Sequence, residues 1–152
     1  MFENEALGEG QGEGEPPLTA KIKKNHLTFL NNWSHKNRPL ESCAILAGKR
    51  NGNQFDVLEI IPMENDDKSD IRFSINEEKL FDAYKKVESI NLSIVGIYHT
   101  HPSQPAPSKT DMTYMQINPV PWVINSTITH ETRCYIHDEN EGVKEIELRV
   151  MG

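Results

Sequence analysis

Residues 93–115 read SIVGIYHTHPSQPAPSKTDMTYM, and this stretch carries the strongest structural signal in the chain. The mostly apolar run SIVGIY at 93–98 predicts a buried β-strand that leads directly into His99. Side chains alternate between the two faces of a strand, so His99 and His101 should project from one face, about 6.6 Å apart at roughly 3.3 Å per residue. Pro102 has no N–H to donate to a strand ladder, so it should end the strand.

The residues after Pro102 bring a carboxylate to the same region. Ser108 is a typical helix N-cap, and Asp111 falls on the first turn of that helix, from which its carboxylate can turn back toward the histidines. Two imidazoles and one carboxylate leave a fourth zinc position open for water, as catalytic zinc sites do. An H-x-H pair on a strand is by itself more often incidental than a metal site. The added Pro102, Ser108 and Asp111 favour a zinc site at His99, His101 and Asp111.

The flanking sequence alternates helical and strand-like segments. Apolar residues from Leu18 to about Trp33 follow one face of a helix. Strands at 42–47 and 55–62, separated by Gly48 and the turn residues 51–53, predict a hairpin. The remaining elements expected in order are a strand at 71–73, a helix through Leu80, Phe81, Tyr84 and Val87 with a capping box at Ser74 and Glu77, a short helix after Asp111, and strands near 122–126, 133–137 and 143–150. This order predicts an α/β (α+β) domain with helices packed on a sheet.

The N-terminal residues 1–17 differ in composition from the rest. They hold four of the nine glycines and end in Pro-Pro, and residues 1–16 contain five glutamates without Lys or Arg. Such a segment buries too little apolar surface to offset its ordering entropy, so we expect 1–17 to be a disordered acidic tail and 18–152 to be one domain. Without the five glutamates, the formal charge of −7 becomes −2 for the remainder. A nearly neutral domain lacks the basic surface that nucleic-acid binding requires.

The remaining composition narrows the class of protein further. No apolar run approaches the roughly 20 residues of a membrane helix, and no secretory signal is visible, so we expect no membrane partner and a cytoplasmic location. Cys43 and Cys134 lie in apolar strand-like runs, which favours buried reduced thiols. The other histidines are scattered singly and are expected to be surface or satisfied core residues: His26, His35, His130 and His137.

The combined pattern resembles the JAMM (MPN+) metalloproteases, a family that includes deubiquitinases and compact prokaryotic members. The family pattern is a glutamate near the domain start, then H-[ST]-H-P, a spacer and S-x-x-D. Here Glu41 in PLESCAILAG, residues 99–102 (HTHP) and residues 108–111 (SKTD) match it. Ala44 stands where the family usually has glycine. Six residues separate His101 from Ser108, where the family usually has seven.

The resemblance implies a fold and a set of residue roles. The fold is a central mixed β-sheet flanked by helices, of the MPN/JAMM, cytidine-deaminase-like type. His99, His101 and Asp111 would ligate one catalytic Zn²⁺ with water in the fourth place. Glu41 would take a proton from that water and pass it to the leaving amine, and Ser108 would hydrogen-bond the oxyanion. Taken without the downstream motif, Glu41 would instead be a solvated charge before a buried strand.

The resemblance also supplies the substrate class. It implies a zinc metalloprotease, a deubiquitinase-like isopeptidase that hydrolyses the bond after the C-terminal tail of ubiquitin or a ubiquitin-like modifier. The extended tail is expected to add a strand to the sheet close to the metal. Two alternatives remain open: a metal-dependent amide hydrolase acting on a small-molecule or sulfur-carrier substrate, and a non-catalytic MPN scaffold.

Overall fold

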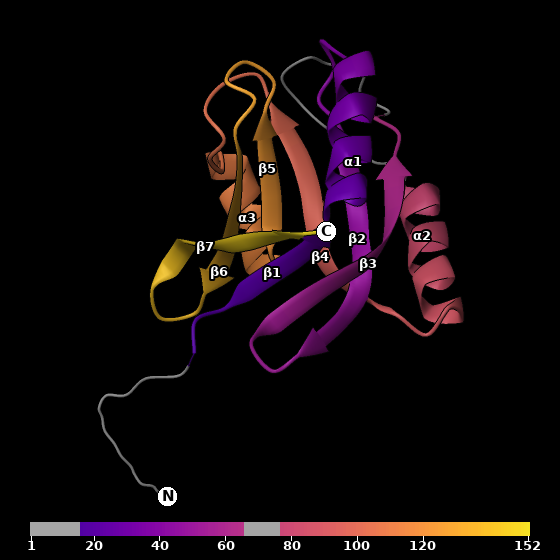
Figure 1. Cartoon of the computed structure of the whole chain (residues 1–152), viewed down its shortest axis with the longest axis vertical. Helices are drawn as coiled ribbons and strands as arrows, with labels where there is room; N and C mark the ends of the chain where they lie inside the picture. The colour runs from indigo at the N-terminus through magenta and orange to yellow at the C-terminus, as the bar shows by residue number, and fades with distance from the viewer. Residues whose placement is uncertain (1–15, 66–76) are drawn as a thin grey trace, which may run out of the picture.

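The computed structural model describes residues 16–65 and 77–152, which form seven strands and three helices (Figure 1). The strands are β1 (Thr19–Lys23), β2 (Cys43–Asn51), β3 (Gln54–Met63), β4 (Ser93–His101), β5 (Trp122–Ser126), β6 (Thr132–Asp138) and β7 (Gly142–Met151). The helices are α1 (Lys24–Lys36), α2 (Glu77–Ser89) and α3 (Lys109–Ile117). No helix among these described residues is long and apolar enough to cross a membrane.

The strands form one mixed sheet that closes into a barrel in the order β1-β3-β2-β4-β5-β6-β7. The predicted hairpin is confirmed as the antiparallel pair β2–β3, and β4 pairs with β2 antiparallel and with β5 parallel. The mixed sheet is therefore confirmed, whereas its closure was not expected from the sequence. Because β4 and β5 are parallel, their carboxyl ends meet at one edge, where the H-T-H segment lies.

The predicted helix from Leu18 to Trp33 is wrong over its first part. Thr19–Lys23 is a strand that pairs in parallel with β7 and with the start of β3, and the helix begins only at Lys24. Ala20 and Ile22 are both buried, which is the two-residue alternation of a strand. Pairing of this segment with β3 and β7 closes the barrel, and this tertiary pairing outweighs the local helical pattern of the sequence.

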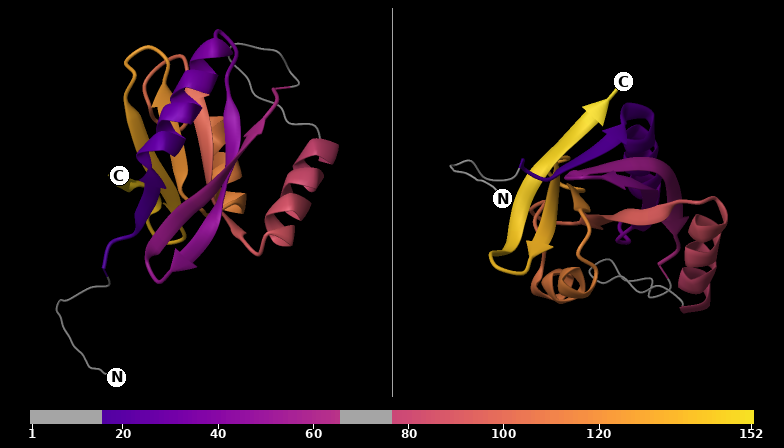
Figure 2. Two further views of the ribbon diagram at one scale, coloured as in Figure 1. Left: turned by 45° about the vertical axis from the view of Figure 1, so that its right-hand side comes forward. Right: turned by 90° about the horizontal axis from the view of Figure 1, so that it is seen from below.

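Two apolar clusters hold the barrel and its helices together. The larger fills the barrel and joins α1 to it through Leu30, which belongs to the same cluster as Tyr98 and Leu46. The smaller lies where α2 packs on β2, β3 and β4. Each helix therefore covers a different side of the barrel (Figure 2).

The helix through residues 80–87 is confirmed as α2, but its buried face differs from the expected one. Ala83 and Val87 are buried, whereas Phe81 is 61% exposed. The predicted strand at 71–73, Ser74 of the predicted capping box, and residues 1–15 of the predicted tail lie outside the described residues. The three C-terminal strands and the helix after Ser108 agree with the sequence prediction.

Candidate metal and catalytic site

The two histidines of the motif lie at the C-terminal end of β4, and their side chains share one of its faces. His99 lies between Cys43 of β2 and Ile124 of β5 in the sheet register. The imidazole rings of His99 and His101 have centroids 4.8 Å apart and are nearly perpendicular, at 87°. Both side chains are buried, so the alternation of the strand places two imidazoles in one enclosed space.

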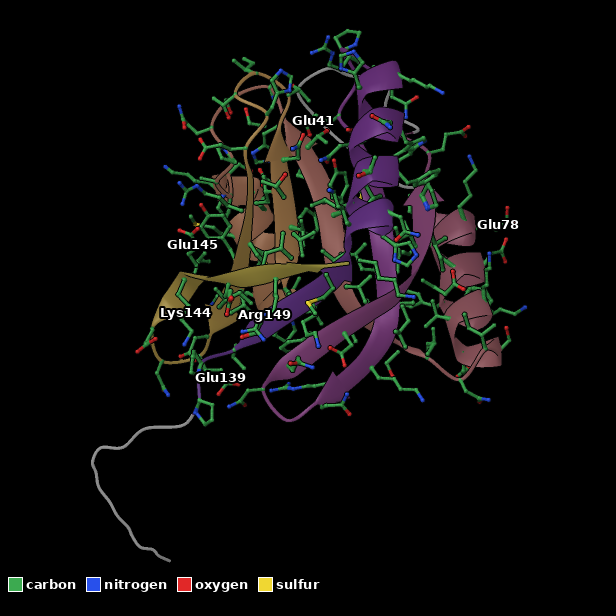
Figure 3. All side chains as sticks on the ribbon, in the orientation of Figure 1. Glu41, Glu78, Glu139, Lys144, Glu145 and Arg149 are labelled. Carbon is green, nitrogen blue, oxygen red and sulfur yellow. The ribbon has the colours of Figure 1, made fainter. Side chains whose placement is uncertain are left out.

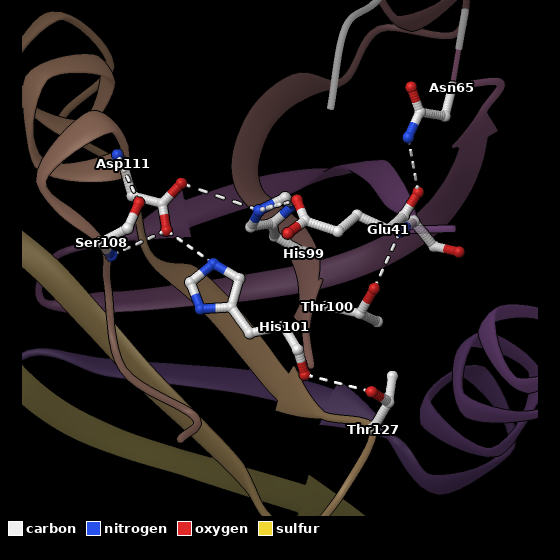
Figure 4. Close-up of polar contacts among 9 residues, drawn as sticks. Glu41, Asn65, His99, Thr100, His101, Ser108, Asp111 and Thr127 are labelled. Carbon is white, nitrogen blue, oxygen red and sulfur yellow. Dashed lines mark hydrogen bonds and ion pairs between the residues drawn. The ribbon is translucent and has the colours of Figure 1, made fainter. Parts of the chain in front are cut away.

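Asp111 reaches the histidines from the first turn of α3. Ser108 is the N-cap, as predicted: its Oγ accepts a hydrogen bond from the Asp111 N–H at 3.1 Å, and its own N–H donates to Asp111 Oδ2 at 3.0 Å. This reciprocal capping box fixes the carboxylate. Asp111 Oδ2 then lies 2.8 Å from His101 Nε2, and Oδ1 lies 3.7 Å from His99 Nε2 (Figure 4).

These three side chains fit the predicted zinc ion. One ligand atom from each of His99, His101 and Asp111 lies within 4.8 Å of the others, and all three residues are buried. Two imidazole nitrogens and a carboxylate oxygen are a typical donor set of a catalytic zinc, which leaves one position open. Among the described residues, this is the group of histidines, cysteines and carboxylates whose ligand atoms lie close enough together to hold a metal ion.

Metal binding needs neutral imidazoles and an ionised carboxylate, and the surroundings favour these states at His99 and Asp111 but favour the protonated form at His101. Burial lowers the pKa of His99 to about 4, helped by the nearby His101 and opposed by Asp111, so its imidazole is neutral at pH 7. Burial also lowers the pKa of His101, but the hydrogen bond with Asp111 and the charges of Asp111 and Glu41 outweigh it and raise the pKa above its ordinary value. Burial raises the pKa of Asp111, yet the hydrogen bond with His101 and the nearby His99 lower it on balance.

Backbone groups orient both imidazole rings from behind. The His99 ring forms a hydrogen bond with the backbone of Ser42, and the His101 ring forms one with the backbone of Ala106 in the proline-containing loop. Partners of this kind hold a ligating histidine in one tautomer and orientation. Thr127 fixes the end of β4, because its N–H donates to the His101 carbonyl at 2.9 Å.

Glu41 lies beside the three candidate ligands rather than among them. Its Oε1 is 3.4 Å from His99 Nε2, and the residue is only 8% exposed. The solvated-charge alternative for Glu41 does not match this burial. Its backbone is held on both sides: Asn65 Nδ2 donates to the Glu41 carbonyl at 3.0 Å, and the following Ser42 N–H donates to Thr100 Oγ1 at 2.8 Å.

A cleft of about 380 Å³ opens beside Glu41. The residues that line it include the apolar Trp33, Leu40 and Met63 and the polar Asn65. Glu41 lines this cleft, whereas the three candidate ligands do not. Figure 3 shows that Glu41 lies far from the labelled charges Glu139, Lys144, Glu145 and Arg149 of the β6–β7 hairpin.

Two residues that hold the site were not found by sequence reasoning. Thr100 is the middle residue of the H-T-H motif and points away from the histidines, so its bond to Ser42 depends on strand pairing. Asn65 follows β3 and has no sequence signal at all. The prediction that Cys43 and Cys134 are buried free thiols is confirmed, and burial raises the pKa of each to about 12.

Such an open three-residue site with a buried carboxylate beside it defines a metal-dependent hydrolase. Comparison with protein families then gives the lineage: the chain belongs to the prokaryotic homologues of the JAB domain, whose family model matches residues 23–136. The resemblance to compact prokaryotic JAMM/MPN+ proteins is thereby confirmed.

Characterised relatives and solved structures agree with this assignment. The chain is 31% identical to the desampylase of Pyrococcus furiosus over 112 residues, which cover 73% of this chain and 76% of that protein. It is 32% identical over 106 residues to AMSH-like ubiquitin thioesterase 1 of Arabidopsis thaliana, covering 68% of this chain and 20% of that protein. A solution structure of a Desulfitobacterium hafniense protein has the same fold, with a TM-score of 0.74 at 23% identity over 88% of this chain and 92% of that one. A Salinibacter ruber protein gives a TM-score of 0.65 at 19% identity, covering 88% and 90%.

Proposed function

We propose that this protein is a zinc-dependent isopeptidase that hydrolyses the bond after the C-terminal tail of ubiquitin or a ubiquitin-like modifier. The observation that carries the proposal is the buried Glu41 carboxylate, 3.4 Å from His99 Nε2 and beside the three candidate ligands. The substrate class is supported by the names of two relatives, a desampylase and a ubiquitin thioesterase.

Each residue of the site has a chemical role in this reaction. His99, His101 and Asp111 would hold one zinc ion, which when bound lowers the pKa of water to about 7 and polarises a carbonyl. Glu41 accepts a proton from the attacking water and donates it to the leaving amine. Ser108 accepts the Asp111 N–H and keeps its own O–H, which donates a hydrogen bond to the developing oxyanion.

The sheet offers a place for an extended tail close to this centre. Within the described residues, the ladder between β1 and β3 ends at Asp56, so the outer edge of β3 after it has no strand partner. The register from Met63 to Cys43 and from Cys43 to His99 links the end of this edge to the site. Addition of the tail as a strand along β3 would lead its C-terminus into the cleft beside Glu41.

The two alternatives from the sequence are less favoured. A scaffold would have no use for a buried carboxylate beside two histidines and an aspartate, because buried charges destabilise a protein unless they are paired. No feature of the described residues favours a small-molecule or sulfur-carrier amide over a protein tail. The cytoplasmic location and the domain limits 18–152 stay predictions.

The proposal is tested by incubating the zinc-loaded protein with linear fusions and lysine-linked conjugates of ubiquitin-like proteins. Cleavage after the terminal Gly-Gly, abolished by a chelator and restored by zinc, is the expected result. Glu41→Gln should remove cleavage while retaining bound zinc, and Glu139→Gln on an exposed turn is the matched control. Unchanged cleavage in Glu41→Gln, or in His99→Ala, would refute the mechanism.

A further inference from the structure

A second cleft, of about 330 Å³, opens between α1 and the turn that follows β5. It shares no lining residue with the cleft beside Glu41. All of its lining residues are polar and none is acidic. The sequence predicted His35 and His130 to be scattered surface or satisfied core residues, but the fold brings both to this cleft together with Arg38.

The charge of Arg38 is not neutralised by any carboxylate among the described residues. Among the described residues its guanidinium forms one hydrogen bond, from Nη1 to the Thr127 carbonyl at 3.3 Å, which leaves most of its five N–H donors for another partner. By contrast, Arg133 pairs with Glu131 and Glu145. In a chain with a formal charge of −7, an unpaired guanidinium in a cleft without acids is a candidate anion-binding group.

The cleft adjoins the proposed catalytic centre. Thr127, which lines it, donates from its N–H to the carbonyl of His101 at 2.9 Å, and its Oγ1 lies 3.3 Å from the same carbonyl (Figure 4). Arg38 lies three residues before Glu41 in the chain. The cleft and the candidate centre therefore meet at the end of β4.

The geometry points to a recognition site for an acidic side chain of the substrate protein, close in sequence to the bond that is cleaved. This inference rests on the proposed function, because it places the cleft beside the scissile bond. A glutamate or aspartate carboxylate would accept hydrogen bonds from the Arg38 guanidinium and from the side-chain amide of Asn32 on the adjacent turn of α1. The site would thus select among lysines by the residues around them.

The test uses short peptides whose central lysine carries a ubiquitin-like protein in isopeptide linkage. The parent peptide has alanine around the lysine, and each variant has one glutamate at a different position. At one position, or two adjacent ones, glutamate should raise kcat/KM about tenfold over alanine. This ratio should fall toward one as the salt concentration rises from about 50 mM to about 500 mM, because Arg38 is exposed.

Substitutions at the cleft should change this ratio in defined directions. Arg38→Ala should bring it to about one, and Asn32→Asp should bring it below one and favour lysine at the same position. Because both substrates are measured on one protein, the ratio is independent of a general loss of activity. Arg133→Ala, which removes an exposed arginine on β6, should keep the tenfold ratio.

Binding measured without turnover separates this inference from the proposed function. Labelled glutamate and alanine conjugates are titrated into zinc-loaded Glu41→Gln protein, and the glutamate form should bind about tenfold more tightly, a difference lost when Arg38→Ala is added. If the parent conjugate is cleaved and glutamate changes kcat/KM at none of the positions, the acidic recognition site is refuted while the isopeptidase function is supported. Selective binding without cleavage in the wild type refutes the isopeptidase and supports the site. A ratio that persists in Arg38→Ala also overturns the site.

Discussion

Thr100→Val is the substitution that most directly tests how the barrel holds Glu41. Thr100 is 1% exposed, and its Oγ1 accepts the Ser42 N–H at 2.8 Å. Valine has nearly the same shape but no acceptor, so the buried Ser42 N–H loses its partner. Leaving a buried donor unsatisfied costs about 1–3 kcal/mol, and we expect the free energy of unfolding to fall by that amount.

The same substitution should affect catalysis more than substrate binding. Ser42 stays attached to β4 through the Thr100 N–H, which donates to the Ser42 carbonyl at 3.0 Å, so the chain should shift rather than detach. A displacement of about 1 Å in a catalytic group can lower the rate about 100-fold. We therefore expect kcat to fall by about 10- to 100-fold, with KM nearly unchanged.

The assays are urea unfolding and steady-state cleavage by the zinc-loaded protein. Thr100→Ser is the matched control, because it keeps the hydroxyl acceptor and loses only a methyl group; its kcat should stay near the wild-type value. Equal kcat values for Thr100→Val and Thr100→Ser would refute the role of this hydrogen bond in positioning Glu41. A kcat loss in Thr100→Val that is accompanied by an equal rise in KM would point to general loosening instead.

Three further outcomes follow from the site. Ser108→Ala removes the N-cap of α3 and should lower the free energy of unfolding by about 0.5–2 kcal/mol, measured in urea. Zinc at about 100 times its Kd should stabilise the protein by about 2.7 kcal/mol, and Asp111→Ala should lose this gain in a thermal melt. In metal-free protein the pKa of His99 is lowered to about 4 from 6.5, so the unfolded chain binds the extra proton; stability should fall as the pH drops from 6.5 to 4, and His99→Gln should flatten this dependence.

Local pattern was enough to predict the geometry of the candidate ligands. The alternation of β4 places His99 and His101 on one face, and the capping of α3 by Ser108 turns Asp111 toward them. Both features depend on residues within a few positions of each other. Glu41 could be linked to them only through the family resemblance, because its approach to His99 depends on the pairing of β2 with β4.

Features that depend on distant pairing could not be predicted. The stretch after Leu18 contains both a strand alternation at Ala20 and Ile22 and a helical spacing further on, and only the neighbouring β3 and β7 decide between them. Likewise, Arg38 and His130 are 92 residues apart in sequence and meet only because α1 packs beside the turn after β5. The pattern of apolar residues within a single segment cannot indicate such a contact between distant segments.

The loop between His101 and Ser108 shows how a departure from the family pattern can leave a site intact. It has six residues, where the family usually has seven, yet Asp111 Oδ2 lies 2.8 Å from His101 Nε2. The backbone of Ala106 forms a hydrogen bond with the His101 ring, and the capping box at Ser108 sets the start of α3. The C-terminal end of the loop is therefore held by contacts with His101 and Asp111, two of the candidate ligands. The six-residue loop is therefore long enough to bring Asp111 within hydrogen-bond distance of His101.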